Sequence, residues 1–405
     1  MASGDYDEVR NRLRAAVAAA RPQHRAALEA ILQSAHDQAT GTLAGGPAPP
    51  EHSVFAGAWA MLHDTPPLHG KLLPAAGALK PYVDPQGAIW GLGKYEQLDP
   101  GWAEALIEFL KYRNNIAPPG TAPQVIQIPD VTTIAIAGDW GTGSYAAPGT
   151  RADGVANQIT AWAPDYTLHL GDVYYAGAPA EEQTNFLTRW PEGKKGSFTL
   201  NSNHEMYAGA HGYFGIALTS KTFALQHGTA YFALVNKNWL VLGLDSAYGA
   251  DPDELYMKGR LDQAQSGWLA TIAGQYEAGR KIIVTSHHEA VLLEEGATKQ
   301  VATTPLWDQV TAAVGRPPDY WYFGHAHNAV TYAPYKGCHC RCVGHGGIPY
   351  GVAIAFQGAA DVTWYEKKLA GDSTLPIRVM NGFVHVSLAG ATITEKLIRE
   401  NGEVV

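Results

Sequence analysis

The chain has 405 residues, of which 46% are hydrophobic and 17% are charged, and its net charge is −9 at pH 7. A chain of this length and composition buries a large core and is expected to form more than one domain. The negative charge excludes non-specific nucleic-acid binding, which needs a basic surface, but it leaves a phosphorylated substrate open because bound metal cations reverse the local charge.

The first part of the chain has a helical pattern. Alanine, leucine and arginine dominate residues 6–39, with Val9, Leu13 and Val17 at helical spacing. The Gly/Pro-rich residues 40–50 end this helix, and a second helix is predicted over 102–112. Because Pro-Pro-Gly at 118–120 is typical of a linker, we predict a mainly helical N-terminal region over 1–125 and a second domain over 126–405.

Beyond this linker, short β-branched runs alternate with helical patterns, which indicates an α/β layer architecture. Strands are predicted at 132–137, 166–170, 239–244, 281–285 and 320–323. Helices are predicted between several of them, at 155–162, 180–189, 263–275 and 304–314. After residue 332 the helices largely stop, and antiparallel strands and hairpins are predicted at 351–356, 360–367, 381–388 and 391–399.

Polar residues follow directly on the predicted strands. Asp139, Asp172, His287 and His325 each come one or two residues after an apolar run, and Asn203-His204-Glu205 forms a further polar cluster. Ligands gather at the carboxyl ends of strands in an α/β sheet, because the loops there leave a rigid support. Carboxylate, amide, imidazole and phenolate donors together suit iron, manganese or zinc better than calcium.

The order of these clusters resembles the calcineurin-like metallophosphoesterase superfamily, whose pattern is Asp-x-His, Gly-Asp-x-x, Gly-Asn-His-Asp/Glu, His and Gly-His-x-His. The resemblance runs from about residue 132 to the C-terminus and implies a four-layer α/β/β/α sandwich, here preceded by an N-terminal helical extension. Gly141 stands where most members carry a histidine ligand. Tyr175, three residues after Asp172, is placed to replace that histidine, and this exchange resembles the purple acid phosphatase branch of soluble bacterial and fungal type.

Carried over residue by residue, the resemblance implies two metal ions. The implied ligands are Asp139, Tyr175 and His327 for the first ion, Asn203, His287 and His325 for the second, and Asp172 between the two. A phenolate is a hard, electron-rich donor, which favours Fe(III) at the first ion, while the second is Fe(II), manganese or zinc. Ser202 stands where a glycine is usual, which implies strain if the backbone before Asn203 needs a positive φ.

The expected reaction is hydrolysis of a phosphate ester of a small molecule, most simply a phosphomonoester, by a metal-held hydroxide. His204 follows a ligand directly and is the candidate to protonate the leaving alkoxide; the alternative is that it only orients a carboxylate. His288 is expected to contact the phosphate, or to be a buried strand-end residue. His211 is a weaker candidate of the same kind.

Other classes of function stay open at this point. The same two-metal site could act on a phosphodiester or a pyrophosphate, or carry out a non-hydrolytic reaction on an iron pair. A non-catalytic scaffold, in which the N-terminal segment binds a partner, is a further alternative.

The three cysteines all lie within residues 338–342. This odd, clustered number is not a disulfide framework, and no secretory leader or membrane-spanning apolar run is visible, so a cytoplasmic location without membrane association is expected. The one-residue spacings suit a single metal ion poorly. A hairpin near the site entrance is therefore favoured over a third metal site or a redox switch.

Overall fold

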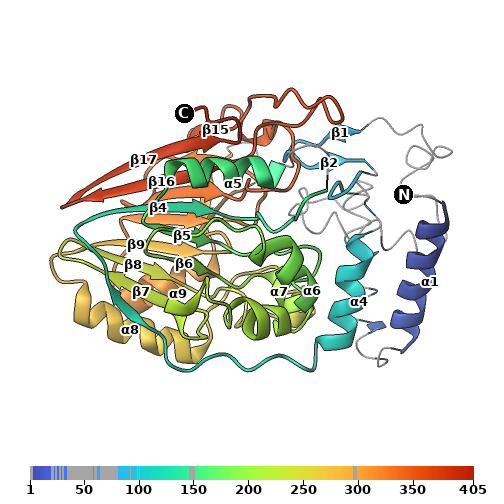
Figure 1. Cartoon of the computed structure of the whole chain (residues 1–405), viewed down its shortest axis with the longest axis horizontal. Helices are drawn as coiled ribbons and strands as arrows, with labels where there is room; N and C mark the ends of the chain where they lie inside the picture. The colour runs from blue at the N-terminus through green and yellow to red at the C-terminus, as the bar shows by residue number, and fades with distance from the viewer. Residues whose placement is uncertain are drawn as a thin grey trace.

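The computed structural model describes residues 3–19, 81–91, 93–97, 101–145, 151–294 and 299–405, with a few isolated residues between 22 and 99. Helices α1 (Ser3–Ala19) and α4 (Trp102–Tyr112) lie side by side at one end of the molecule (Figure 1), and Arg12 on α1 pairs with Glu104 on α4 at 2.6 Å. The predicted helix over 6–39 is thus described as far as residue 19, and the predicted break at 40–50 lies outside the described residues. The domain boundary at residue 125 stays a prediction.

Two sheets form the centre of the fold. The larger contains eight strands, in spatial order β15 (Val362–Tyr365), β13 (Ala329–Tyr332), β14 (His339–Val343), β12 (Tyr320–Phe323), β9 (Lys281–Ser286), β8 (Trp239–Gly243), β7 (Phe232–Val235) and β3 (Val125–Gln127). The smaller contains five strands, in spatial order β17 (Thr392–Arg399), β16 (Gly382–Ala389), β4 (Val131–Ala137), β5 (Tyr166–His169) and β6 (Gly196–Thr199). Two short hairpins lie outside these sheets, β1 (Tyr82–Val83) with β2 (Ile89–Trp90) and β10 (Val291–Leu293) with β11 (Val301–Thr303).

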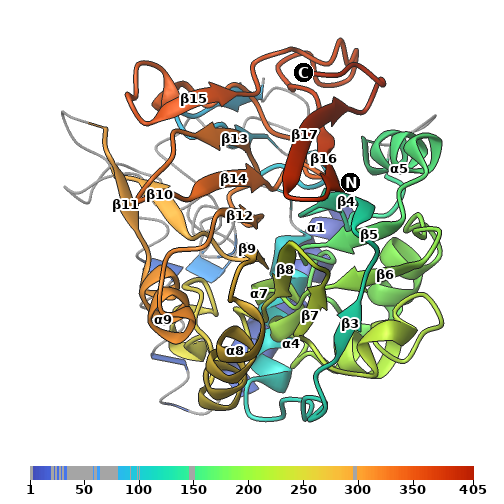
Figure 2. The same ribbon diagram turned by 90° about the vertical axis from the view of Figure 1, so that its left-hand side faces the viewer.

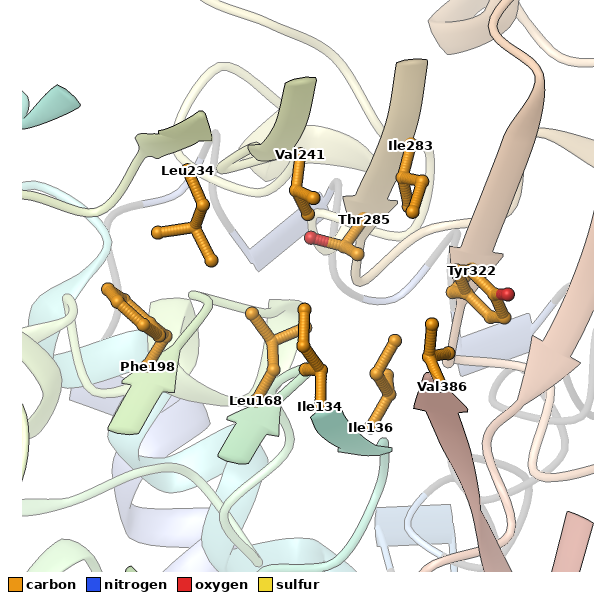
Figure 3. Close-up of a pocket in the computed structure, with 10 residues that line it drawn as sticks. All are labelled: Ile134, Ile136, Leu168, Phe198, Leu234, Val241, Ile283, Thr285, Tyr322 and Val386. Carbon is orange, nitrogen blue, oxygen red and sulfur yellow. The ribbon is translucent and has the colours of Figure 1, made fainter. Parts of the chain in front are cut away.

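Apolar side chains on alternate strand positions hold the layers together. The inner layer lies between the sheets, where Leu168 and Phe198 of the smaller sheet face Leu234 and Val241 of the larger one across a small apolar cavity (Figure 3). On the outer faces, α8 (Gln263–Tyr276) and α9 (Pro305–Val314) cover the larger sheet and α5 (Arg151–Trp162) covers the smaller one (Figure 2). The predicted α/β architecture with two packed sheets is therefore confirmed.

The strands that carry the predicted ligands run parallel to one another within each sheet. Strand β5 pairs parallel with both β4 and β6, and β9 pairs parallel with both β8 and β12. Antiparallel pairing joins β16 to β4 and β17 and joins β13 to β14 and β15. The carboxyl ends of the parallel strands consequently lie at one edge of each sheet.

Two predicted elements differ from the structure. Residues 351–356 form no strand, and their only regular element is a short 3-10 helix (Ile354–Phe356). The backbone N–H groups of Gly351 and Ala355 donate to the carbonyls of Gly87 and Pro85 in the N-terminal region. These N–H groups are therefore not available for hydrogen bonds to a neighbouring strand. The predicted helix over 180–189 is split into α6 (Pro179–Glu181) and a π-helical turn, η1 (Glu182–Leu187).

The cysteine cluster lies in the larger sheet. Strand β14 forms the predicted hairpin with β13, and its thiols are buried in an apolar layer that includes residues of α8 and α9. The Cys342 Sγ lies 3.2 Å from the carbonyl oxygen of Asn328, which follows His327. Cys338 and Cys340 approach each other to 3.8 Å between sulfur atoms, and all three cysteines are free thiols. Among the helices of the described residues, none is long and apolar enough to cross a membrane.

A buried ion pair joins one edge of the larger sheet to the smaller sheet. Arg399, the last residue of β17, holds Glu366, which follows β15, through two bonds of 2.7 and 2.9 Å. The Glu366 side chain is fully buried and that of Arg399 is 10% exposed.

We expect Glu366→Ala to lower the free energy of unfolding by about 3 kcal/mol, because it removes the buried carboxylate of this pair and leaves the Arg399 guanidinium only Glu403, whose side chain is 39% exposed. Urea unfolding measures this loss. The matched control is Lys258→Ala, which breaks a pair whose side chains are 69% and 43% exposed and should change stability little. Equal effects of the two substitutions would contradict the structural role given to Glu366.

Candidate metal centre

The polar cluster is built from both sheets. Asp139 follows β4, Asp172 follows β5, and Asn203 begins the short helix α7 (Asn203–Tyr207) after β6. His287 directly follows β9 in the larger sheet, and His325 and His327 follow β12. Six of the seven predicted ligands meet at the edge where these strands end. All six are buried, with at most 5% of the residue exposed.

Four of these residues hold the backbone in the left-handed region. Their φ angles are 57° at Asp139, 77° at Asp172, 69° at His325 and 46° at His327. Residues other than glycine rarely adopt such angles, and where they do the strain commonly marks a functional site. The chain therefore turns at the predicted ligands themselves. Glycines precede Asp139, Asp172 and His325, and of these three glycines only Gly171, at φ 98°, also has a left-handed backbone.

Position 141 has no room for a side chain. A Cβ on Gly141 would lie 2.5 Å from the carbonyl oxygen of Asp172 and 2.6 Å from Cα of Val173. The Gly141 N–H also donates to this carbonyl at 3.0 Å, which brings the two loops together. The backbone of this chain thus excludes the histidine that the resemblance would place at position 141.

One group of donors surrounds His287. Its Nε2 lies 2.9 Å from Oδ1 of Asn203, 3.0 Å from Nδ1 of His325 and 3.3 Å from Oδ1 of Asp172. The other ring nitrogens of both histidines face backbone carbonyls, Nδ1 of His287 at 3.0 Å from Leu170 O and Nε2 of His325 at 3.1 Å from Met257 O. Since a carbonyl only accepts, these nitrogens carry the hydrogens, and the two nitrogens that face each other present lone pairs.

Such an arrangement needs a positive charge between the lone pairs. Burial lowers the pKa of His287 to about 3, so His287 does not supply that charge by taking up a proton near neutral pH. A cation bound by both imidazoles would turn the repulsion into coordination.

A second group of donors surrounds His327. Its Nε2 lies 3.3 Å from Oδ1 of Asp139, 3.7 Å from Oδ2 of Asp172 and 3.0 Å from the hydroxyl of Tyr174. The Tyr174 hydroxyl is 2.7 Å from Oδ2 of Asp172. Asp172 therefore directs one oxygen into each group.

The spacing of these donors fits bound metal ions. Ligand atoms at metal–ligand distances of about 2.0–2.2 Å lie about 3 Å apart on neighbouring corners of a coordination shell. The separations in the two groups run from 2.7 Å to 3.7 Å. The Asp139 and Asp172 carboxylates are fully buried, and burying such charges is costly unless they are paired or bound to metal. The residues present are thus able to hold two cations with Asp172 between them.

Tyr175 does not belong to this cluster, and Tyr174 takes the place predicted for it. The Tyr175 hydroxyl donates to Oδ2 of Asp99 at 2.5 Å, and its ring packs against Tyr95 and Trp102. Burial and the Asp99 carboxylate raise the pKa of Tyr175 far above its usual value, which disfavours a phenolate there. Asp99 comes from the N-terminal region, and no local spacing in the sequence reveals its contact with this loop.

His204 lies beside the cluster. Its Nδ1–H donates to the carbonyl of Tyr175 at 2.6 Å, and its Nε2 faces Oδ2 of Asp172 at 3.9 Å. Burial lowers the pKa of His204, while the Asp172 carboxylate opposes this shift. The nitrogen available for proton transfer therefore points toward the donors.

The two predicted substrate residues do not present nitrogen atoms to this site. His288 lies near the cluster, and one nitrogen each from His287, His288 and His325 falls within 4.8 Å of the others. Both ring nitrogens of His288 are nevertheless engaged at 2.8 Å, Nδ1 with Ser246 Oγ and Nε2 with Tyr256 O, so we do not count it as a ligand. His211 bonds the carbonyl of Asn115 at 2.8 Å and packs against the ring of Tyr112, so its contacts are with the N-terminal region rather than with the donors.

Behind the cluster lies a carboxyl group that the sequence prediction did not use. Glu205 is fully buried, and Asp172 N–H donates to its Oε2 at 3.3 Å. Burial and the neighbouring Asp172 carboxylate raise the pKa of Glu205 to about 8. Ser202 lies between the two side chains at φ −136°, so it does not carry the backbone strain that its replacement of a glycine suggested.

The N-terminal region covers the cluster. Trp102 packs on the rings of His204 and Tyr174, each with its centroid 5.8 Å away, and Tyr95 packs on Tyr174 at 5.6 Å. A small recess reaches His327 between Gln86 and Gln97 on the N-terminal side and Asn328 and Tyr350 on the other. None of these contacts was predicted, because they depend on packing between segments far apart in the sequence.

Comparisons with known proteins agree with this site. Residues 132–329 match the family described as calcineurin-like phosphoesterase, a segment that contains every residue of both donor groups. None of the curated proteins matches the chain.

Several solved structures are similar at low sequence identity. Purple acid phosphatase PPD1 from yellow lupin (Lupinus luteus) seeds is 15% identical over 68% of this chain and 52% of its own, with a TM-score of 0.44. GAP50, the anchor in the inner membrane complex of Plasmodium, is 13% identical over 68% of this chain and 87% of its own, with a TM-score of 0.44. A dimetal phosphatase from Danio rerio is 11% identical over 68% of this chain and 98% of its own, with a TM-score of 0.43. The match thus spans about half the length of the lupin enzyme.

We expect Asp172→Asn to abolish binding of two metal ions, because it removes the only carboxylate that both donor groups share. Elemental analysis of metal per chain measures the loss. The matched control is Asp245→Asn, at a buried aspartate that accepts hydrogen bonds from Ala247, Tyr248 and Asn201 outside the cluster. Retention of two ions by Asp172→Asn would contradict the shared role of this carboxylate.

Proposed function

We propose that this chain, whose residues 132–329 match the calcineurin-like phosphoesterase family, hydrolyses phosphate esters of small molecules at a two-metal centre. The observation that carries the proposal is the arrangement around Asp172, whose two oxygens face two separate groups of nitrogen and oxygen donors. A phosphomonoester is the proposed substrate.

The two donor groups would divide the cations between them. The first group comprises Asp139, Tyr174 and His327, the second comprises Asn203, His287 and His325, and Asp172 contributes to both. Two cations held there would polarise the phosphoryl oxygens and lower the pKa of a bound water. The chain's part is to fix the donors on rigid strand ends and to exclude bulk water, which strengthens the electrostatic attraction in the site.

His204 is the proposed general acid. Its Nδ1–H is held by the Tyr175 carbonyl, so the ring is oriented and Nε2 is the nitrogen that carries a proton toward the site. An alkoxide leaves poorly unless it is protonated, and a positioned histidine is suited to that transfer. The aromatic contacts of Trp102 and Tyr174 limit the movement of the ring.

We expect His204→Ala to lower kcat on an alkyl phosphate by about 10²–10⁴-fold, since no group then protonates the leaving oxygen. On p-nitrophenyl phosphate the loss should be much smaller, because nitrophenolate leaves without protonation. His211→Ala is the control histidine and should leave both rates unchanged. Equal losses of kcat on both substrates, or loss of metal from His204→Ala, would refute the role of His204 as general acid. A parallel assay on bis(p-nitrophenyl) phosphate tests whether the chain is instead a phosphodiesterase.

The phenol of Tyr174 supports Fe(III) as the cation of the first group. A phenolate oxygen is a hard donor that Fe(III) prefers over softer alternatives, whereas nothing in the second group distinguishes Fe(II), manganese and zinc. The hydroxyl of Tyr174 already lies within 3.0 Å of both His327 Nε2 and Asp172 Oδ2.

With Fe(III) bound, we expect a visible tyrosinate charge-transfer band that disappears in Tyr174→Phe and persists in Tyr175→Phe. The two substitutions remove the same atom from adjacent residues, so each controls for the other. Loss of the band only in Tyr175→Phe would show that Tyr174 is not the ligand. A colourless wild-type protein that binds other metals and hydrolyses phosphate esters would contradict Fe(III) as the bound metal and leave the proposed phosphoesterase activity standing.

A further inference from the structure

Ser202 lies between two buried carboxyl groups next to the donor cluster. Its Oγ is 2.5 Å from Oδ1 of Asp172 and also contacts Oε2 of Glu205. The same oxygen accepts the His204 N–H at 3.0 Å and so caps the start of α7. Ser202, Asp172 and Glu205 are all fully buried.

The hydroxyl has little freedom to leave this position. A Cβ on Gly171 would lie 2.8 Å from Cβ of Ser202, so the backbone before Asp172 packs closely against the serine. The cap on His204 N–H fixes the hydroxyl from the other side. The loop after β5 and the start of α7 are thus joined through one oxygen atom.

The oxygen that Ser202 contacts is the one directed to the second donor group. Oδ1 of Asp172 lies 3.3 Å from Nε2 of His287, whereas Oδ2 faces His327 and Tyr174. Hydrogen bonds to a ligating carboxylate orient it and commonly change metal affinity or activity by about 10–100-fold. A glycine, the usual residue at this position in the superfamily that the chain resembles, has no hydroxyl to make such a bond.

We propose that Ser202 is a positioning residue, whose hydroxyl holds Oδ1 of Asp172 toward His287 and Asn203 and so sets the affinity of the second donor group for its cation. The inference rests on the proposed two-metal function. It assigns no chemical step to Ser202, which acts through Asp172.

The test is a titration of the metal-free full chain with Mn²⁺, in which electron paramagnetic resonance counts the free ion. Wild type should bind two ions, and Ser202→Ala and Ser202→Gly should each weaken one of the two sites by about tenfold while leaving the other unchanged. Excess Mn²⁺ should restore the turnover of both variants, which it would not do for a folding defect.

A second variant tests whether the loss of a helix cap by itself changes metal binding. Asp262 caps α8 by accepting Gln265 N–H at 2.7 Å, far along the chain from the donor residues. Asp262→Ala should lower the melting temperature without changing either Mn²⁺ affinity.

Unchanged Mn²⁺ affinities in Ser202→Ala and Ser202→Gly would overturn the role of Ser202 and leave the two-metal centre intact. An equal weakening of both sites would also overturn it, because the contact reaches only Oδ1. A wild-type chain that binds no Mn²⁺ would overturn the two-metal function for this ion together with the inference built on it.

Discussion

The fold depends on the burial of the Asp172 carboxylate between two sets of donors. A carboxylate removed from water is unfavourable unless opposite charge or hydrogen bonds replace the lost solvation. In the described part of the chain, the ion-pair partners of Asp172 are histidine rings, of which His287 is held neutral by burial. A neutral His287 ring contributes no charge to balance the buried carboxylates. Cations held in both donor groups would supply this balance, and metal binding would then contribute to the stability of this edge of the molecule.

The backbone around the cluster carries strain that rigid strands offset. Asp139, Asp172, His325 and His327 all take left-handed angles, each at a cost of the order of 1–3 kcal/mol. Such angles persist only where the surroundings determine them. Here each residue follows a buried strand within two packed sheets, and loops such as the one at Gly141 approach so closely that no side chain fits. The sandwich thus holds donors from both sheets at separations that a flexible loop would not maintain.

Strand ends were predictable because they depend on local periodicity. Apolar runs placed β4, β5, β9 and β12 within one or two residues, and the polar residues after them include five of the six predicted ligands that meet in the cluster. The sixth, Asn203, begins α7 after β6, a strand that was not predicted. Tyr174 could not be distinguished from Tyr175 in this way, since the choice follows from Asp99 binding the second hydroxyl. The strand predicted at residues 351–356 is absent for a similar reason, because the backbone N–H groups there donate to the carbonyls of Gly87 and Pro85. In these two cases, what escaped prediction is a contact with the N-terminal region.

That region therefore acts on the site through contacts rather than through donors of its own. Asp99 holds Tyr175 away from the cluster, and Trp102 closes over His204 and Tyr174. Together they leave the donors almost fully buried, with the recess beside His327 as an approach in the described part of the chain. Low solvent exposure strengthens the attraction between carboxylates and cations, since Coulomb energies rise as the effective dielectric falls. The same cover packs against His204, so in the proposed phosphoesterase the N-terminal contacts would affect both how tightly cations are held and which esters reach them.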